Sequence, residues 1–385
     1  MKIALVQDGL MCRGGGEQVA LCFHKAFPAA PIYTLCYGSE LTFPEFKECD
    51  IRPSWLQNFV KTDEMMKKVF FPFGILAMKS LNLSDYDVVL MSGTHCAKYV
   101  KTHKRALVIS YSFTPFRLAW DPASYPQYVL STGWKRMLFD QVISILRTID
   151  KNAAQRPNHF VAMTDETADR LRNAYDRNDV IRIINPPVKV NNFNVSPGDK
   201  NSYFLVVSRL EYYKKVDLVI DAFNELGYRL VVVGKGTQES EIKNRAKSNI
   251  EFMSGLSAEK LAEVYANCRA FIFPQHEDYG ITPLEANACG KPVIAYGAGG
   301  VVTTQIPVGD ESSVANSTAI FFEEQDINHL INAVKKFERL EPFFDPLFIR
   351  KNAEKFDEAI FISKIQKYVK EMYRNTFVEE EVLTR

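Results

Sequence analysis

The stretch from Phe271 to Gly300 constrains the fold of this chain more than any other. It opens with three apolar residues, FIF, and a run without a polar face is typical of a strand that is buried on both sides of a parallel sheet. After a loop, Thr282 and Pro283 suit the N-cap and the first turn of a helix. Pro292–Tyr296 then has the pattern of a second strand, and a glycine turn follows it. The stretch therefore predicts an α/β domain.

Two acids flank the predicted helix start with seven residues between them, Glu277 in the loop and Glu285 in the first helical turn. Each carboxylate could accept hydrogen bonds from sugar hydroxyls, and the free amides of Gly280, Ile281 and Thr282 could hold phosphate or sugar oxygens. The alternative is that Glu285 only complements the helix dipole and that Glu277 is a solvated loop acid. Either acid alone favours that alternative, whereas the combined pattern favours a sugar-binding site.

This E-x7-E spacing resembles the signature of the retaining glycosyltransferases of family 4. That family has the GT-B architecture, in which two Rossmann-like domains face each other across a cleft. The resemblance implies an α/β chain with two doubly wound parallel sheets, whose C-terminal helix crosses back to the first domain. Further motifs extend the resemblance over almost all 385 residues.

The length of the chain suits two domains. Asn185–Val188 closes a strand with two prolines, and the polar stretch after it is typical of an extended connection. We therefore predict an N-terminal, acceptor-side domain over residues 1–188, a linker over 189–200 and a C-terminal, nucleotide-sugar-binding domain over 201–355. Residues 356–385 would form the crossing helix.

Strand and helix patterns alternate along both halves of the chain, as in α/β proteins. Further strands are predicted at Lys2–Gln7, Pro31–Leu35, Asp87–Met91, Ala106–Tyr111, His159–Ala162, Tyr203–Ser208, Leu230–Gly236 and Asn249–Ser254. Helices are predicted at Gln18–Phe27, Leu256–Asn267, Ile327–Leu340 and Asp357–Arg374, with Thr164 and Ser257 as helix caps.

Composition limits the partners and the compartment. A net charge of +1 excludes a strongly basic nucleic-acid footprint over the whole chain. The seven cysteines are scattered without a C-x-x-C pair, which indicates neither a disulfide scaffold nor a zinc site and favours a reducing compartment. The first residues form a predicted strand rather than a signal sequence, and no apolar run approaches the roughly 20 residues that span a bilayer. We expect a cytoplasmic protein, at most peripheral at the inner face of the membrane.

A glycine run, Gly14-Gly15-Gly16-Glu17, follows the first predicted strand. Such a turn lets a diphosphate approach backbone amides at a helix start, although a plain tight turn is the alternative. The run is not G-x-G-x-x-G, which speaks against a dinucleotide-dependent dehydrogenase. It resembles the GGE loop of family 4, and that resemblance implies that Gly15 and Gly16 face the donor phosphates.

Arg209 and Lys214 follow the first strand of the second domain and can converge on one diphosphate. A surface ion pair with Glu211 or Asp217 is the alternative. The pattern R-L-x-x-x-K-x-V-D resembles the donor-phosphate motif of family 4, which favours the phosphate site.

The segment 111–121, YSFTPFRLAWD, follows a predicted strand end, where substrate contacts gather in α/β sheets. It resembles the Y-x-H-T-P-x-R-x-x-W-D stretch of a subgroup similar to GDP-mannose-dependent mannosyltransferases of polysaccharide and O-antigen biosynthesis. Phe113 stands where the family has histidine, so the sugar contact of that imidazole is absent or supplied otherwise. Arg117, Trp120 and Asp121 are candidates for donor or acceptor contacts, and a surface salt bridge with a packed indole is the alternative.

Asp85-Tyr86-Asp87 matches the D-x-D motif that holds a divalent ion in metal-dependent transferases. We reject that role because these acids precede their strand, whereas ligands gather at the carboxyl ends of strands. The sequence therefore predicts no metal and no other cofactor.

Met65–Met78 combines Lys67 and Lys68 with large apolar residues around Pro72. A buried connection between helices is one interpretation, and a patch for an anionic membrane or an acceptor is the other. A second basic cluster contains Lys98, Lys101, His103, Lys104 and Arg105, and it is equally compatible with a solvated surface.

The resemblance implies transfer of a hexose, mannose from GDP-mannose, to a glycan or lipid-linked saccharide with retention of configuration. Arg209 and Lys214 would stabilise the leaving diphosphate in place of a metal. Glu277 would hold sugar hydroxyls and Glu285 the ribose, and no residue is assigned as a covalent nucleophile. The alternatives are a UDP-sugar donor, a nucleotide-sugar epimerase of the same architecture, which needs no acceptor, and a nucleotide-binding regulatory protein.

Overall fold

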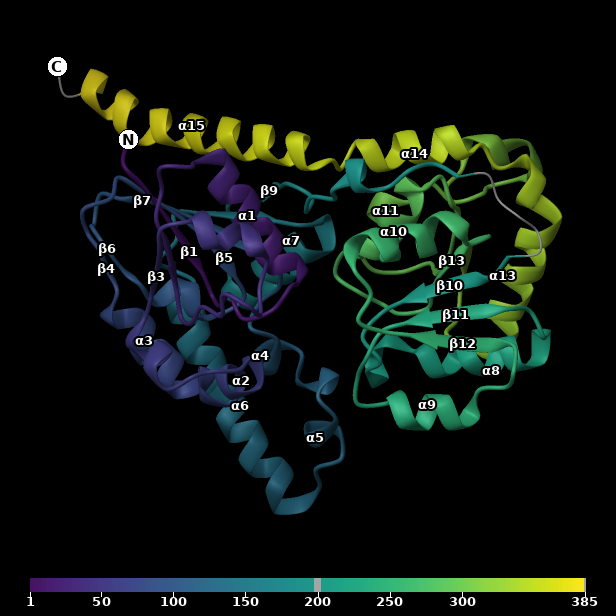
Figure 1. Ribbon diagram of the computed structural model, residues 1–385. Coiled ribbons are helices and arrows are strands. Elements are labelled where there is room, and N and C mark those ends of the chain that lie inside the picture. The colour runs from purple at the N-terminus through teal and green to yellow at the C-terminus, as the bar shows by residue number, and fades with distance from the viewer. Residues whose placement is uncertain (197–201, 384–385) are drawn as a thin grey trace. The chain divides into compact units, whose positions relative to one another are not determined.

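The chain forms two compact units. The computed structural model describes residues 1–196 and 202–383, without the side chains of residues 67, 70, 71, 126 and 378–383. One unit comprises Met1–Pro187 together with Ala359–Arg385, and the other comprises Val188–Glu358. Each unit contains a parallel sheet with helices on both faces (Figure 1). The first unit is therefore completed by residues that follow the whole of the second.

The first unit is built on a seven-stranded parallel sheet with the strand order β3-β2-β1-β5-β7-β8-β9. Its strands are β1 (Ile3–Gln7), β2 (Ile32–Thr34), β3 (Ile51–Pro53), β5 (Val88–Gly93), β7 (Leu107–Ser112), β8 (His159–Ala162) and β9 (Arg182–Ile183). A separate pair is formed by β4 (Asn82–Leu83) and β6 (Lys101–Thr102). The order reverses between β1 and β5, which makes the carboxyl ends of these two strands the topological switch point of the sheet.

The second unit repeats this plan with six parallel strands in the order β12-β11-β10-β13-β14-β15. They are β10 (Phe204–Val207), β11 (Leu230–Val233), β12 (Ile250–Met253), β13 (Phe271–Phe273), β14 (Val293–Tyr296) and β15 (Ala319–Phe322). Its switch point lies between β10 and β13, which are neighbours in space although two strands separate them in sequence. In doubly wound sheets, ligands bind outside the carboxyl ends of such a strand pair.

Helices connect successive strands and cover the sheets (Figure 1). In the first unit they are α1 (Gly15–Ala26), α2 (Asp63–Val69), α3 (Ile75–Ser80), α4 (Arg117–Trp120), α5 (Pro126–Val129), α6 (Gly133–Ala153), α7 (Asp165–Tyr175) and most of α15 (Glu358–Leu383). In the second unit they are α8 (Val216–Leu226), α9 (Glu239–Arg245), α10 (Ala258–Asn267), α11 (Ile281–Ala288), α12 (Val301–Thr304), α13 (Ile327–Leu340) and α14 (Pro346–Glu354).

Every predicted strand is present, with ends that shift by at most three residues. Thr164 and Ser257 cap α7 and α10 as predicted, because each side-chain oxygen accepts a backbone N–H three residues later. The start of α1 was predicted wrongly. Gly15 and Gly16 lie in its first turn rather than in a loop, because Gly14 supplies an extended N-cap. Helix α6 was not predicted before Ile149, and apolar side chains on both its inner and outer faces obscure its pattern.

The C-terminal helix packs on the first unit, as predicted. Phe361 of α15 stacks on Phe23 of α1 with ring centroids 6.0 Å apart, and it meets the edge of Tyr111 of β7 at 5.8 Å. The side-chain amide of Gln366 donates to the carbonyl of Ala26 at 2.8 Å. The α15 side chains thus complete a core that begins with the first helix.

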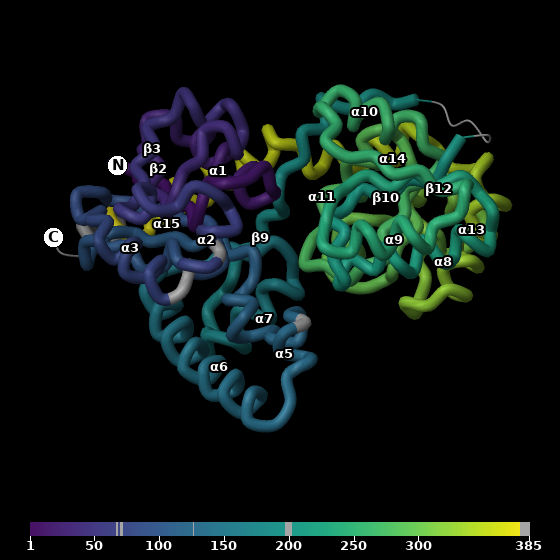
Figure 2. Tube along the Cα trace, turned by 60° about the horizontal axis from the view of Figure 1, so that its bottom comes forward, coloured from purple at the N-terminus to yellow at the C-terminus, as the bar shows by residue number. Residues whose placement is uncertain are grey.

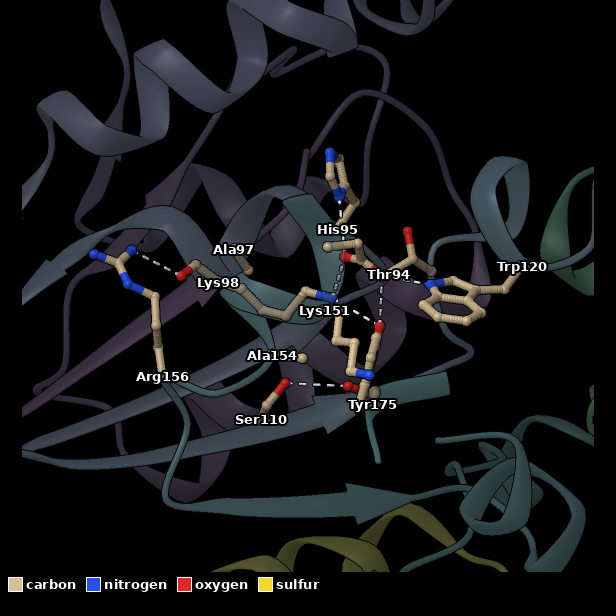
Figure 3. A network of polar contacts seen from close by, with 12 residues as sticks. Thr94, His95, Ala97, Lys98, Ser110, Trp120, Lys151, Ala154, Arg156 and Tyr175 are labelled. Atoms are coloured by element: carbon tan, nitrogen blue, oxygen red, sulfur yellow. Dashed lines mark hydrogen bonds and ion pairs between the residues drawn. The ribbon is translucent and has the colours of Figure 1, made fainter. Parts of the chain in front are cut away.

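A buried polar network around the carboxylate of Asp150 joins the segment after β5 to α4, α6 and α7 in the first unit. Figure 3 shows its members His95, Lys98, Trp120 and Tyr175. Asp150 is fully buried, and it accepts from the Lys98 ammonium at 2.7 Å, the Trp120 indole at 2.9 Å and the Tyr175 hydroxyl at 2.9 Å. The His95 ring lies at 3.4 Å. Burial alone would raise the pKa of Asp150, but Lys98 and His95 hold it well below its usual range. The network therefore contains a buried ion pair.

Within residues 1–196 and 202–383, no helix combines the length with the apolar character needed to cross a bilayer.

We predict that Asp150→Asn lowers the free energy of unfolding by about 3–5 kcal/mol, because it leaves the Lys98 ammonium buried without its counter-charge. The native pKa of Asp150 is depressed, so its stabilisation is fully present above the pKa of an unfolded aspartate and is lost only as the pH falls through the native pKa. Urea unfolding should show the same loss at every pH between neutral and mildly acidic.

Asp169→Asn is the matched control, because this acid pairs with Arg172 on the exposed face of α7. It should change stability by less than about 1 kcal/mol. Equal effects of the two substitutions would contradict the buried-pair interpretation.

Candidate functional site

Lys214 and Glu277 meet at the switch point of the second sheet. Lys214 ends a short 3-10 helix after β10, and Glu277 lies in the loop after β13. The Lys214 ammonium donates to one oxygen of Glu277, and the side-chain amide of Gln275 donates to the other at 3.2 Å. Lys214 is buried, and a buried cation is stable only with such a partner. The sequence placed these two residues in one site, and the structure brings them into contact.

Tyr213 brings the second cation, Arg209, to the same place. Its hydroxyl accepts from the Arg209 guanidinium at 2.5 Å, and its ring lies 5.9 Å from that guanidinium and 5.2 Å from the Lys214 ammonium. Both cations thus lie near one aromatic ring. Arg209 is exposed, so its charge faces solvent and is open to an anionic ligand.

The charges of this cluster favour an ionised Glu277. Burial alone would raise its pKa, but the nearby Lys214 charge, the hydrogen bonds from Lys214 and Gln275 and the charge of Arg209 bring the pKa below the ordinary value. The side chain of Glu277 is still 32% exposed. It therefore remains accessible to a ligand while it holds the Lys214 ammonium in position.

Glycines let the loops around this cluster approach one another at backbone distance. A Cβ on Gly234 or Gly236, after β11, would lie 1.8 Å or 2.2 Å from a carbonyl oxygen of the loop that carries Arg209. A Cβ on Gly299 or Gly300, after β14, would lie 2.5 Å or 2.3 Å from backbone atoms of residues 277–279. The Gly300 amide also donates to the Glu277 carbonyl at 2.7 Å. Backbone packing therefore fixes the two loops that carry Arg209 and Glu277.

The start of α11 differs from the prediction. The helix begins at Ile281 with Gly280 as its N-cap, rather than at Pro283 with Thr282 as the cap. Gly280 has a φ of 90°, and a Cβ there would lie 2.8 Å from the Phe273 ring. Pro283 is tolerated as the third helical residue because the first four amides of a helix lack intrahelical acceptors anyway. The amides of Gly280, Ile281 and Thr282 still lie at a helix start, next to the Glu277 loop.

Glu285 is consequently the fifth residue of α11 and lies beyond its first turn. Its carboxylate, which was predicted to accept hydrogen bonds from sugar hydroxyls, already accepts one from the protein. The Tyr265 hydroxyl of α10 donates to one of its oxygens at 2.7 Å. Burial raises the pKa of Glu285, and this hydrogen bond opposes the rise. One oxygen therefore has a protein donor already. No local pattern pointed to Tyr265 as that donor, because it lies 20 residues away.

At the switch point of the first sheet, Asp8 organises the turn after β5. Its carboxylate accepts the backbone amides of Thr94 at 2.7 Å, His95 at 3.0 Å and Ala97 at 2.6 Å. A Cβ on Gly93 would lie 2.4 Å from the Asp8 carboxyl carbon, so only glycine fits there. The sequence analysis missed this contact, although an acid directly after the first strand was a usable signal.

The glycine run after β1 also differs in detail from the prediction. Gly16 lies against Phe113, and a Cβ on it would lie 3.2 Å from the Phe113 ring. Glu17 places a buried carboxylate at the same helix start, where it accepts from the Cys12 thiol at 3.1 Å. Burial raises the pKa of Glu17, and hydrogen bonds from Cys12 and the backbone oppose the rise. A phosphate near Gly15 and Gly16 would therefore meet this acid, and the phosphate role of both glycines stays a prediction.

The three candidate residues of the segment 117–121 differ in their surroundings. Trp120 packs edge-on against Tyr175 at 6.0 Å and donates its indole N–H to Asp150, so it has the packed position of the alternative interpretation. Asp121 is exposed, and its carboxylate accepts from the Ser124 hydroxyl. Arg117 begins α4 and is partly exposed, which keeps it as a candidate for a ligand contact.

Two basic features of the sequence lie outside this site. Lys98, a member of the second basic cluster of the sequence, is buried and paired with Asp150. In the stretch Met65–Met78, Met66, Ile75 and Met78 are buried, whereas Met65, Phe73 and Leu76 are exposed; the side chain of Lys67 lies outside the described residues. The stretch is therefore partly a core connection and partly an apolar surface.

Two doubly wound parallel sheets, with a C-terminal helix that returns to the first unit, define the GT-B fold, as the sequence predicted. A solved structure with this fold is Anabaena Alr3699/HepE in complex with UDP-glucose. It matches with a TM-score of 0.71 and 16% identity over 96% of this chain and 100% of that one. At this identity the likeness establishes the fold and nothing further.

Residues 189–360 match the family described as Glycosyl transferases group 1. Among curated proteins, O-antigen chain mannosyltransferase C of Escherichia coli is 27% identical over 180 residues, which are 45% of this chain and 40% of that protein. Alpha-1,3/1,6-mannosyltransferase ALG2 of Dictyostelium discoideum is 31% identical over 176 residues, 38% of this chain and 41% of that protein. The chain thus spans about two fifths of the length of these relatives.

We predict that Tyr265→Phe destabilises the protein by about 1.5–3 kcal/mol at neutral pH, because it removes a hydrogen bond to a buried carboxylate. The native pKa of Glu285 lies above that of an unfolded glutamate, so ionisation costs stability as the pH rises through it. Loss of the hydroxyl raises that pKa further, and the destabilisation measured by urea unfolding should grow from acidic to neutral pH.

Tyr203→Phe is a control without a titrating acceptor, because the Tyr203 hydroxyl donates to the backbone carbonyl of Val264 at 2.9 Å. Its destabilisation should not change over the same pH range. A pH-independent effect of Tyr265→Phe would show that Glu285 is not the group that the hydroxyl stabilises.

Proposed function

We propose that this protein is a retaining, metal-independent glycosyltransferase with a nucleotide-diphosphate sugar as donor. The observation that carries the proposal is the contact of Lys214 with Glu277 at the switch point of the second sheet. This contact lies within the 189–360 region that matches the Glycosyl transferases group 1 family. A cationic cluster at that position suits a ligand that carries phosphates and hydroxyls.

Arg209 and Lys214 would stabilise the negative charge that develops on the leaving diphosphate. Electrostatic stabilisation by fixed groups is usually the largest contribution to such catalysis. Glu277 holds the Lys214 ammonium in place before the donor binds, so little reorganisation is needed. Two cations in this role would replace a metal ion, so the proposed reaction would require no cofactor.

The remaining residues of the site would bind the donor. Glu277 would accept hydroxyls of the transferred sugar, and the free oxygen of Glu285 would accept those of the ribose. The amides of Gly280, Ile281 and Thr282 would bind sugar or phosphate oxygens at the start of α11. In the first unit, Gly15 and Gly16 begin α1 and are the candidates for further phosphate contacts.

The proposed donor is GDP-mannose, and the proposed acceptor is a glycan or a lipid-linked saccharide. The similarity to two mannosyltransferases supports the sugar, and the segment 111–121 supports the donor. A UDP-sugar is the second candidate, because the structurally similar HepE was solved with UDP-glucose. The protein would act in the cytoplasm, with peripheral contact to the membrane that carries a lipid-linked acceptor.

Retention would proceed without a covalent intermediate, by departure and attack on the same face of the sugar. Glu277, the carboxylate at the centre of the site, is engaged by Lys214 and Gln275. Mass spectrometry of enzyme incubated with a slow donor analogue tests this mechanism. A glycosyl adduct on the protein would overturn it.

We predict that Lys214→Ala lowers kcat by about two orders of magnitude or more, because it removes a charge that stabilises the transition state. Steady-state transfer assays with purified protein measure this change. Lys260→Ala is the control, because Lys260 lies on the exposed face of α10 and pairs with Glu263. Unchanged kinetics of Lys214→Ala would remove this residue from the site.

A panel of nucleotide sugars should identify the donor. Ligand at about 100 times its Kd adds about 2.7 kcal/mol of apparent stability, so the true donor should raise Tm measurably. We expect the largest rise with GDP-mannose, a smaller rise with UDP-glucose and no change of either rise with EDTA. A larger rise with a UDP-sugar would reassign the donor, and loss of the rise with EDTA would contradict metal independence.

A further inference from the structure

Gln7, the last residue of β1, places a side-chain amide at the switch point of the first sheet. The residue is 4% exposed. Ser92 lies beside it in the β1–β5 register, and the Ser92 hydroxyl donates to the Gln7 Oε1. This hydrogen bond orients the amide, so its Nε2 points away from Ser92.

The Gln7 Nε2 faces the start of α1. A Cβ on Gly16, the second residue of α1, would lie 3.5 Å from this nitrogen. Among residues 1–196 and 202–383, no acceptor lies within hydrogen-bond distance of it. It is also not one of the unpaired polar atoms that this part of the chain encloses completely, so solvent reaches it. A buried amide with an unpaired donor is expected where a ligand supplies the acceptor.

An aromatic ring borders the same place. The Phe113 ring would lie 3.2 Å from the Cβ on Gly16, and it meets the edge of the Tyr111 ring at 5.7 Å. The amide and the ring therefore flank the side of Gly16 that carries no side chain. Aromatic surface with a few well-placed polar groups is typical of small-molecule sites.

Helix α1 is held firmly, which fixes the position of Gly16. Figure 1 and Figure 2 both show α1 beside the first part of α15. Phe23 stacks on Phe361 between the two helices, and Gln366 donates to the Ala26 carbonyl at the end of α1. A ligand at the start of α1 therefore meets a wall that is already in place.

Glu17 makes this place unfavourable for an anion. Its side chain folds back over the helix start, because a Cβ on Gly14 would lie 2.8 Å from the Glu17 Oε2. Burial raises the pKa of Glu17, whereas hydrogen bonds from the Cys12 thiol and from the amides of Glu17 and Gly14 lower it. The carboxylate thus takes up amides of the helix start, and it repels a phosphate. An uncharged hydroxyl meets no such repulsion.

We propose that Gln7 binds a sugar hydroxyl, with its Nε2 donating to the hydroxyl oxygen and the Phe113 ring packing against the C–H groups of the same sugar. This inference rests on the proposed transferase function, whose substrates carry such hydroxyls. The hydroxyl belongs either to the transferred hexose or to the acceptor saccharide, and the contact is chemically the same in both cases.

Titration calorimetry with the full chain and the variant Gln7→Met, which replaces the amide by a thioether, tests this contact. If the hydroxyl belongs to the donor, the variant should bind GDP-mannose or UDP-glucose about three- to tenfold more weakly, as expected for one lost hydrogen bond, and GDP or UDP unchanged. If it belongs to the acceptor, binding of methyl α-mannopyranoside to the GDP-saturated protein should weaken by the same factor.

Gly16→Ala tests the contact without changing the amide. The φ of Gly16 is not positive and alanine favours helices, so Tm should stay near that of the wild type after a small shift of the Phe113 ring. The new methyl group would cover the Gln7 Nε2, and the same loss of sugar binding should follow. This variant decides the question if Gln7→Met does not fold.

Gln57→Ala is the control, because the protein already pairs both ends of that amide. The Tyr37 amide donates to the Gln57 Oε1 at 2.6 Å, and the Gln57 Nε2 donates to the Tyr37 carbonyl at 3.0 Å. The control should lower Tm and leave every affinity unchanged.

Three outcomes would overturn the sugar contact. If the wild type binds a nucleotide sugar and the two site variants bind it and the mannoside equally well, Gln7 has no such role and the proposed function stands. An equal loss for GDP and GDP-mannose would place the nucleotide, not the sugar, at Gln7. A wild type that binds no nucleotide sugar would overturn the proposed function and this inference together.

Discussion

Reversal of strand order in a parallel sheet is the constraint on which both units depend. Where the chain turns from one direction across the sheet to the other, the loops after two adjacent strands run to opposite faces and leave their carboxyl ends uncovered. In the second unit this point brings Lys214 and Glu277 together. In the first unit it brings Asp8 to the amides of residues 94–97. Each sheet therefore presents a carboxylate at the edge where a ligand can enter.

Two of the buried lysines, Lys98 and Lys214, show how one type of ion pair can serve different purposes. Lys98 faces an aspartate with no exposed surface, and an indole and a phenol complete the shell around that carboxylate. Lys214 faces a glutamate that keeps about a third of its side chain exposed. The first pair can only hold helices and a loop together. The lysine of the second pair is also buried, but the side chain of its glutamate remains partly exposed to solutes.

Sequence patterns predicted the longer buried strands, because apolar runs are local properties, but they did not predict β3, β4, β6 and β15. They were insufficient where a distant residue decides the outcome. The helix start at Ile281 depends on contact between Gly280 and Phe273. The hydrogen bond that the Glu285 carboxylate accepts depends on Tyr265 in another helix. The burial of Lys98 depends on Asp150, 52 positions away. Local reasoning could only place Lys98 in a basic cluster that was compatible with a solvated surface, because lysine is seldom buried without a partner.

The return of α15 to the first unit has a consequence for the order of folding during synthesis. Phe361 packs against both Phe23 and Tyr111, so a growing chain lacks part of that core until the ribosome has passed residue 361. Residues 188–358 are contiguous and contain their own sheet and core. The unit made later can therefore fold first, reversing the usual sequence in which domains mature from the N-terminus.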